Sequence, residues 1–96
     1  MDNNYITIVI VKDDNGFKEV FTAPGIQSLE EGELVYTEVD GNFRTWKKFY
    51  EVVYSDSYEL DSWALRMLSN MPGMPPRLEE VPKLAGSARI KEFKNE

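Results

Sequence analysis

The chain has 96 residues, of which 42% are hydrophobic and 12% aromatic, a composition typical of one small globular domain and not of a disordered segment. Its formal net charge of −6 opposes binding to nucleic acid and to anionic membranes, although a local basic surface can overcome that field. Histidine and cysteine are both absent, which removes the commonest general base, the commonest metal ligands and every disulfide.

Sequence motifs for catalysis, targeting and membrane insertion are missing as well. The chain has no glycine-rich phosphate loop and no G-x-S-x-G elbow, so we expect no enzyme, no catalytic residue and no cofactor. Its longest apolar run is short, and the N-terminus MDNNY lacks the pattern of a signal peptide. Together with the lack of cysteine, these features predict a cytoplasmic protein.

The first β-hairpin is predicted over residues 5–22. Its first strand, YITIVIV, is β-branched and apolar on both alternating faces, which is typical of a strand covered on both sides. The turn DDNG follows, with Asn15 and Gly16 as the expected pair of residues with positive φ. The alternating run FKEVFT completes the hairpin as its second strand.

The second hairpin is predicted over residues 34–54. Its entry has the pattern Leu-x-x-Gly-x-x-Val from Leu29 to Val35, and Gly32 is expected to supply a tight turn there. The two strands are expected to join at a two-residue type I′ turn, because Asp40 and Gly41 stand between β-branched and aromatic runs.

One amphipathic helix is predicted over residues 57–70. Asp56 as N-cap and Glu59 three residues later have the spacing of a capping box. An apolar stripe wide enough to lie against a sheet follows at helical spacing: Leu60, Trp63, Ala64, Met67 and Leu68.

Beyond the helix, residues 71–82 are predicted to form a proline-rich linker. The linker contains the pattern P-x-x-P-x-R at residues 72–77, which either serves SH3 domains as a ligand or only stiffens the connection. Residues 88–93 alternate, and the sequence leaves two alternatives open for them: a return as a closing strand, or an irregular segment. The expected core consists of Ile6, Ile8, Ile10, Phe21, Leu34, Tyr36, Val52, Leu60, Trp63, Ala64 and Leu68.

The order of hairpin, Ala-Pro break, Leu-x-x-Gly-x-x-Val entry, second hairpin and helix resembles that of SH3-like small barrels, over residues 5–70. More loosely, it is similar to the N-terminal DNA-binding module of primosomal replication-restart helicases. It also resembles small uncharacterised proteins of bacterial phages and mobile elements, in which a strand ending like EVVYSD precedes a helix. The expected fold is therefore mainly β (α+β): a single domain over residues 1–96, with a four- or five-stranded, partly open SH3-like barrel and one helix packed on it.

The main candidate site is a basic and aromatic strand face. On a regular strand Arg44, Trp46, Lys48 and Tyr50 point to the same side, with Lys47 as a further cation and Phe43 and Phe49 as flanking rings. Such a face can stack bases on rings while its cations hold phosphates. Alternatively, the lysines deter edge pairing and the rings cover the core.

The remaining candidates are acidic clusters and methionines. Aligning Gly16 with the invariant glycine of a calcium loop puts Val11 at the first ligand position and Thr22 at the last, so this turn is not a calcium site. We interpret the carboxylate clusters as turns, caps and solvated loops that together make an acidic surface. Met67 is expected in the core, whereas Met71 and Met74 lie in the linker.

Three hypotheses for function follow. The first is a non-catalytic protein-interaction module, an accessory protein of a bacterium or its mobile elements, with the acidic surface and the Met/Pro segment as its contact regions. The second is a single-stranded nucleic-acid binder that uses Arg44, Trp46, Lys48 and Tyr50, and the third is an acidic inhibitor that mimics DNA. The partner protein is unknown, no membrane is involved, and an open sheet edge allows a monomer or an edge-paired homodimer.

Overall fold

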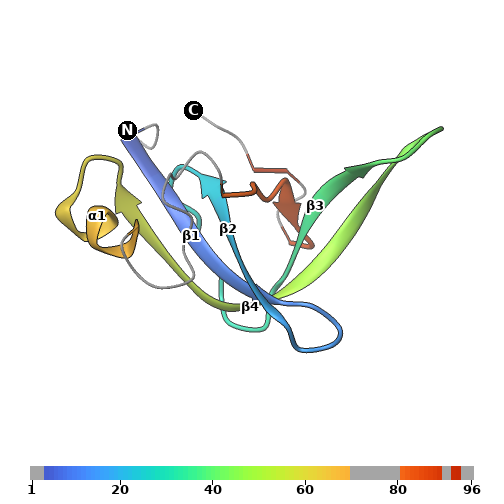
Figure 1. The fold of residues 1–96 in the computed structure, drawn as a ribbon, viewed down its shortest axis with the longest axis horizontal. Coiled ribbons are helices and arrows are strands. Elements are labelled where there is room, and N and C mark those ends of the chain that lie inside the picture. The colour runs from blue at the N-terminus through green and yellow to red at the C-terminus, as the bar shows by residue number, and fades with distance from the viewer. Residues whose placement is uncertain (1–3, 70–80, 90–91, 94–96) are drawn as a thin grey trace.

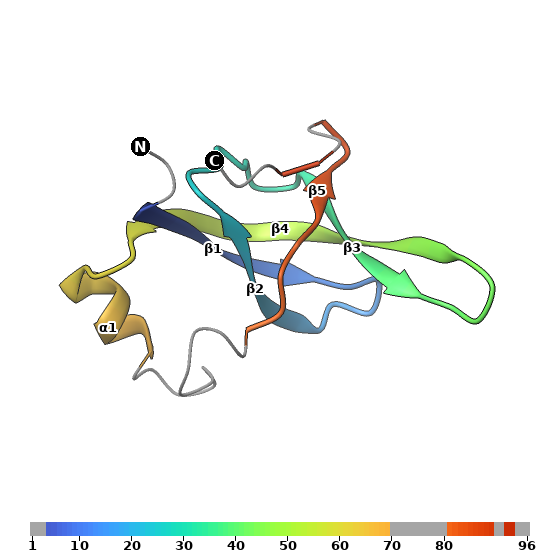
Figure 2. The same cartoon turned by 90° about the horizontal axis from the view of Figure 1, so that it is seen from above.

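In the part of the chain that the structure describes, five antiparallel strands form one sheet and a short helix follows the fourth strand (Figures 1 and 2). The structure, a computed structural model, describes residues 4–69, 81–89 and 92–93. The elements are β1 (Tyr5–Lys12), β2 (Lys18–Pro24), β3 (Leu34–Asp40), β4 (Thr45–Glu59), α1 (Trp63–Ser69) and β5 (Gly86–Ser87). The strands lie in the order β2-β1-β4-β3-β5, which confirms the mainly β class; the sheet is not closed.

The β1–β2 turn lies where it was predicted, but a side chain shapes it. The Asp13 carboxylate accepts hydrogen bonds from the backbone N–H groups of Asn15 and Phe17, at 2.8 and 3.0 Å. Only Gly16 has a positive φ, of 84°, so the expected pair of positive φ angles is wrong at Asn15. Because the Asp13 side chain satisfies the turn's donors, Asn15 has no need of a left-handed conformation.

One face of the sheet carries the main core, and the segment after residue 80 covers it. Thr22 of β2 accepts a hydrogen bond from the Leu84 N–H at 2.8 Å, and Tyr36 of β3 accepts one from the Ala85 N–H at 2.8 Å. The segment therefore crosses from the free edge of β2 to the free edge of β3 (Figure 2). The core cluster consists of Val9, Val11, Phe21, Ala23, Val35, Tyr50, Val52, Leu84 and Phe93.

The predicted core is confirmed in the sheet and wrong around the helix. The residues that are buried as expected are Ile8, Phe21, Tyr36 and Val52, while Ile6 and Ile10 are half-buried. The residues expected in the core that are exposed instead are Leu34, Leu60, Trp63 and Ala64. The side chain of Leu68 lies outside the described residues.

The helix begins later than the sequence suggests. Residues 56–59 remain in β4, paired with β1 as far as Tyr5 and Glu59, so the predicted start at residue 57 is wrong. Ser62 caps α1 instead, because its hydroxyl accepts the Leu65 N–H at 3.2 Å. Pairing with β1 thus outweighs the local capping signal at Asp56. In the described chain no helix is long and apolar enough to cross a membrane.

The later capping site changes which side of the helix faces the protein. Leu65, which does not belong to the predicted stripe, is buried, whereas Trp63 is 75% exposed. Met67 is exposed too, so its expected place in the core is wrong. Among the described side chains of α1, Leu65 is therefore the one that is buried.

The structure describes only part of the segment that follows the helix. Most of the linker over residues 71–82, including the P-x-x-P-x-R motif, Met71 and Met74, lies outside the described residues. On the side of β3 away from β4, the pairing strand is β5, which begins two residues before the segment considered as a closing strand. Of residues 88–93, the four that the structure describes are not in a strand, so the irregular alternative holds for them and the closing strand does not.

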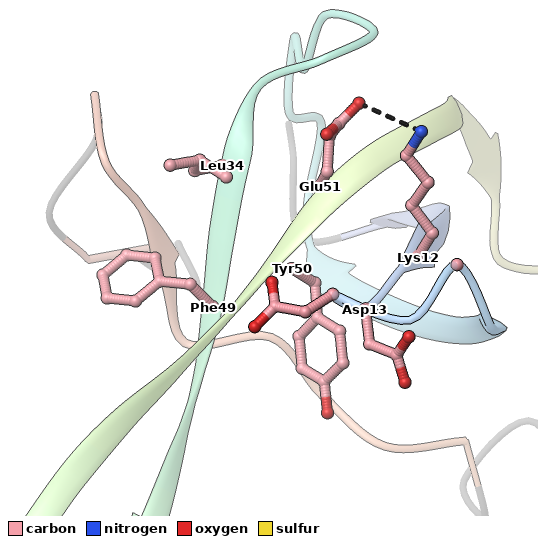
Figure 3. Close-up of a pocket in the computed structure, with 8 residues that line it drawn as sticks. Lys12, Asp13, Leu34, Phe49, Tyr50 and Glu51 are labelled. Atoms are coloured by element: carbon pink, nitrogen blue, oxygen red, sulfur yellow. Dashed lines mark ion pairs between the residues drawn. The ribbon is translucent and has the colours of Figure 1, made fainter.

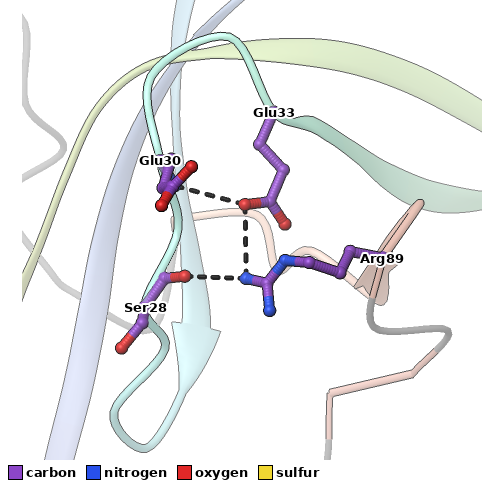
Figure 4. A network of polar contacts seen from close by, with 4 residues as sticks. All are labelled: Ser28, Glu30, Glu33 and Arg89. Carbon is purple, nitrogen blue, oxygen red and sulfur yellow. Dashed lines mark hydrogen bonds and ion pairs between the residues drawn. The ribbon is translucent and has the colours of Figure 1, made fainter.

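The loop that leads into β3 is held by a polar network (Figure 4). The Arg89 guanidinium donates to the Ser28 carbonyl at 2.8 Å and lies 3.3 Å from the Glu33 carboxylate. That carboxylate also accepts the Glu30 N–H at 3.2 Å. Gly32 has the positive φ, 89°, that its tight turn requires. The network joins this loop to the segment after β5.

Candidate functional site

The far half of the β3–β4 hairpin, residues 37–49, projects beyond the other strands as a two-stranded arm (Figure 1). β1 pairs with β4 only at residue 51 and beyond, and β5 pairs with β3 only at Val35 and Tyr36. Every residue from 42 to 49 is exposed, although successive side chains of a strand point to opposite faces. Neither face of the arm is therefore covered by another described element.

The arm exposes three large aromatic side chains. Phe43 is fully exposed in the turn, and Trp46 and Phe49 are 49% and 45% exposed on β4. Small soluble proteins expose single apolar residues routinely, but a group on one projecting element is typical of an interaction surface.

The tip of the arm differs from the predicted two-residue turn. Asp40 pairs with Thr45, so four residues form the connection, and Gly41 has no positive φ. The Gly41 N–H donates to the Arg44 carbonyl at 2.8 Å, and a Cβ at position 41 would overlap the Trp46 ring. Glycine is therefore needed at this position for space and not for a left-handed conformation.

The structure separates the four predicted site residues. Trp46 and Lys48 lie on the same side of β4 and are exposed. Tyr50 lies farther along on that side, but it is buried in the core, with its ring 5.0 Å from that of Phe21. Arg44 lies in the turn, outside β4. Only Trp46 and Lys48 therefore remain together as an accessible pair.

Opposite this pair, a second group lies on the other side of the arm. The Tyr36 and Phe49 rings pack at 5.6 Å between centroids, and the Lys47 ammonium lies 4.6 Å from the centre of the Tyr36 ring. The sequence pattern named Lys47 and Phe49 as neighbours of the site, but it gave Tyr36 only a core role. The cross-strand register that joins Tyr36 to Phe49 could not be read from either strand alone.

Charge is distributed unevenly between the arm and the rest of the chain. Arg44, Lys47 and Lys48 against Glu38 and Asp40 give residues 37–49 a net charge of +1, which leaves −7 for the remaining residues. The arm is therefore a weakly basic element on an acidic protein.

The pKa values of two groups, Lys48 in the arm and Tyr36 at its base, are raised above their ordinary values. The Tyr50 hydroxyl, followed by the carboxylates of Glu19 and Asp13, raises the pKa of Lys48. Burial, followed by the nearby charges of Glu38 and Glu92, raises the pKa of Tyr36. Lys48 therefore stays cationic and Tyr36 stays neutral at physiological pH.

A shallow cavity of about 370 Å³ lies at the base of the arm (Figure 3). An ion pair between Lys12 and Glu51, at 3.5 Å, bounds it on the side of β1. The cavity is lined by Lys12, Asp13, Asp14, Gly16, Leu34, Phe49, Tyr50 and Glu51. This lining holds no thiol or imidazole, and the described residues form no cluster of three or more metal-ligating side chains.

A second cavity of about 410 Å³ lies at the other end of the sheet and is more apolar. Its walls include Tyr5 and Ile6 of β1, Pro24 of β2, Leu60 and Leu84. Lys83 is the one charged side chain among the described residues of its lining, so these residues offer shape with little chemistry that would select a ligand.

Comparison of the chain with protein-family models, with curated proteins and with solved structures finds no match. The functional assignment therefore depends on the geometry of the arm and the charge around it.

Proposed function

We propose that the protein is a non-catalytic protein-interaction module and that the arm is its contact surface. The observation that carries this proposal is the exposure of both faces of the arm, with the rings of Phe43, Trp46 and Phe49 in solvent. Aromatic residues and arginine are enriched at protein interfaces and supply most of the anchoring side chains there. The arm adds little to the core, so a partner that covers it can bury apolar surface without disturbing the fold.

This proposal refines the sequence-based one. The acidic surface and the Met/Pro segment were the expected contact regions, and the Met/Pro segment lies outside the described residues. The arm is the better contact region because its exposed rings are grouped on one projecting element. The finer assignments, an SH3-like partly open barrel and a cytoplasmic accessory protein of a bacterium or its mobile elements, belong to the same proposal.

The test is affinity capture from the source cells with matched variants. One bait carries Phe43→Ala, Trp46→Ala and Phe49→Ala in the arm. The control bait carries Phe17→Ala and Trp63→Ala, which remove two aromatic side chains that are more exposed than Trp46 and lie outside the arm. We expect a protein that binds the wild type and the control but not the arm variant, with a dissociation constant then measured on the purified pair. Equal capture by the arm variant and the wild type would exclude the arm as the contact surface.

A second candidate function, binding of single-stranded nucleic acid, is favoured by the Trp46–Lys48 pair. A ring and a cation on the same side of a strand match the stacking and phosphate contacts that such ligands use. The charge of −7 outside the arm opposes it. The test is fluorescence anisotropy of a labelled single-stranded oligonucleotide at low and at physiological salt. Binding that weakens with salt and is lost in a Trp46→Ala, Lys48→Ala variant would favour this function.

A further inference from the structure

Along one edge of the arm, the described part of the chain places no neighbouring strand. β4 has 15 residues, and β1 lies beside it only from Glu51 to Glu59. Residues 45–50 have β3 on one side, and no described strand lies on the other. β1 ends at Lys12, which pairs with Glu51, and the chain then turns back into β2. A strand added beside residues 45–50 would therefore occupy the position that β1 would have if it were longer.

The backbone groups that face this space can be identified from the hydrogen bonds. The Val52 N–H donates to the Glu33 carbonyl at 2.9 Å, and the Val52 carbonyl accepts the Gly32 N–H at 2.8 Å. Val52 therefore points its backbone toward the β3 side, and alternation along a strand gives Trp46, Lys48 and Tyr50 the same direction. The backbone N–H and C=O groups of the alternate residues Thr45, Lys47 and Phe49 face the open edge.

The side chains along this edge set what can pair with it. One face presents Lys47 and Phe49, and the other presents Trp46 and Lys48. Two copies of the edge that pair about a twofold axis bring their lysines close together, and like charges in neighbouring positions destabilise a sheet. Lysines on an edge strand are a known means of preventing such self-pairing. The edge is therefore better suited to a strand that carries carboxylates beside the two lysines.

We propose that the open edge of β4 at residues 45–50 binds an extended acidic segment of a partner protein as an added strand. This inference rests on the proposed protein-interaction function and specifies its mode. The segment has the pattern apolar–acidic–acidic–apolar, with its apolar residues beside Trp46 and Phe49 and its carboxylates beside Lys47 and Lys48. The pattern reads the same in both directions, so it holds for a parallel and for an antiparallel strand. Main-chain hydrogen bonds supply affinity in this mode, and alternating side chains supply specificity.

The lysine ammonium groups are placed to receive these carboxylates. The ammonium of Lys47 lies over the Tyr36 ring, and that of Lys48 lies 5.2 Å from the centre of the Tyr50 ring. The rings hold the ammonium groups near the strand, so less side-chain freedom is lost when a carboxylate binds. Both lysines are exposed, which leaves their remaining N–H donors accessible.

The binding test uses the whole protein and two labelled synthetic peptides in fluorescence anisotropy. One peptide has the central sequence Val-Glu-Glu-Val and the other has Val-Lys-Lys-Val in the same flanks. We expect the acidic peptide to bind about ten-fold or more tightly than the basic one at low salt, because the basic peptide repels both lysines. Equal affinity for the two peptides would overturn the charge requirement. Stronger binding of an unlabelled single-stranded oligonucleotide in competition would assign the arm to nucleic acid instead.

The pairing itself is tested on the backbone amides. Hydrogen exchange followed by NMR should show new protection of the N–H groups of Thr45, Lys47 and Phe49 when the acidic peptide binds. The N–H groups of Trp46 and Lys48 already face β3 and should change little. Binding without new protection at the first three positions would show that the peptide lies on the side chains and is not an added strand.

Two substitutions at Lys47 measure separately how its backbone N–H and its charge contribute to peptide binding. Lys47→Gln removes only the cation. We expect it to weaken binding of the acidic peptide about three- to five-fold, within the range for one partly exposed charge. Lys47→Pro also removes an outward N–H that is not needed for pairing with β3, so the arm should persist while peptide binding is lost. If Lys47→Pro lowers the thermal midpoint strongly, Thr45→Pro serves instead, because it removes an outward N–H and keeps both lysines. Its control is Thr45→Val, which removes the same hydroxyl and keeps the N–H.

The same proline variants in the capture experiment distinguish the two proposals. A partner that is lost with the aromatic arm variant but retained by Thr45→Pro and Lys47→Pro would support the interaction module and exclude strand addition. A partner that is retained by all of these variants would exclude both proposals.

Discussion

β4 passes through two regions of the molecule with opposite environments. In the body of the sheet Tyr50 and Val52 are only 5% and 1% exposed, whereas every residue from Thr45 to Phe49 is exposed in the arm. Both halves of the strand carry aromatic residues, so composition does not explain the difference. The body is covered by the segment after residue 80, and no described element covers the arm. Burial of a side chain on β4 therefore depends on whether another segment packs over that part of the strand.

The two regions are also stabilised by contacts of different range. The body depends on contacts between distant parts of the chain, such as the hydrogen bonds that join β2 and β3 to residues 84 and 85. The arm depends on neighbours within the hairpin, including the Tyr36–Phe49 ring pair and the hydrogen bond from the Thr45 hydroxyl to Asp40 at 3.2 Å. We expect the body to set the free energy of unfolding and the arm to contribute little to it.

The largest effect should come from a phenylalanine of the body. Phe21→Ala removes a buried ring that packs against Tyr50 and should lower the free energy of unfolding by about 3–5 kcal/mol. Phe17→Ala, at an exposed position in the same hairpin, should change it by no more than about 0.5 kcal/mol. Urea denaturation followed by circular dichroism measures both. A similar loss in the two variants would contradict the placement of the core.

The helix gives a second contrast, because it has one buried and one exposed large side chain. Leu65→Ala should cost about 2–4 kcal/mol, as expected for a buried leucine. Trp63→Ala should cost less than about 1 kcal/mol, since the ring is largely in solvent. Thermal unfolding of the two variants ranks them. If Trp63→Ala is the more damaging change, the stripe predicted from the sequence faces the protein after all.

At the tip of the arm, we expect the space at position 41, and not its backbone conformation, to determine the effect of a substitution on stability. Gly41→Ala places a methyl group against the Trp46 ring and close to the Arg44 carbonyl, at a cost of about 1–2 kcal/mol. In a Trp46→Ala background the same change should cost less, although the contact with the Arg44 carbonyl remains. A double-mutant cycle from urea denaturation measures this coupling. Equal costs in both backgrounds would mean that the ring does not restrict position 41.

The last effect should appear only at alkaline pH and in the body. A hydrogen bond with Tyr54, together with burial, raises the pKa of Tyr58 from 10.0 to about 12. Because the unfolded chain loses this proton at lower pH, the contribution is complete below pH 10 and is lost as the pH rises toward 12. Tyr58→Phe should therefore reduce the fall in stability over this range, which urea denaturation at several pH values measures. An unchanged fall would exclude Tyr58 as its source.

Much of the sheet could be predicted from the sequence. The β-branched run of β1, the turn DDNG and the glycine at position 32 each specify local geometry through their own chemistry, and the two hairpins follow from them. The candidate site was predicted as a basic and aromatic segment on the second hairpin, and most of that segment lies in the projecting arm. Its division into two faces, with Tyr36 under Lys47, required the register between β3 and β4.

What the sequence determined by itself is the first four strands, the places of the turns within the two hairpins and the acidic character of the chain, because these depend on residues that are neighbours in the chain. Only the tertiary structure decided where the helix starts, since pairing of residues 56–59 with β1 prevents Asp56 from acting as a cap. It also decided that Tyr50 is buried and Trp46 exposed, because the covering segment crosses the sheet at one and not at the other. Contacts between residues far apart in the chain, which no local pattern encodes, separate the arm from the body.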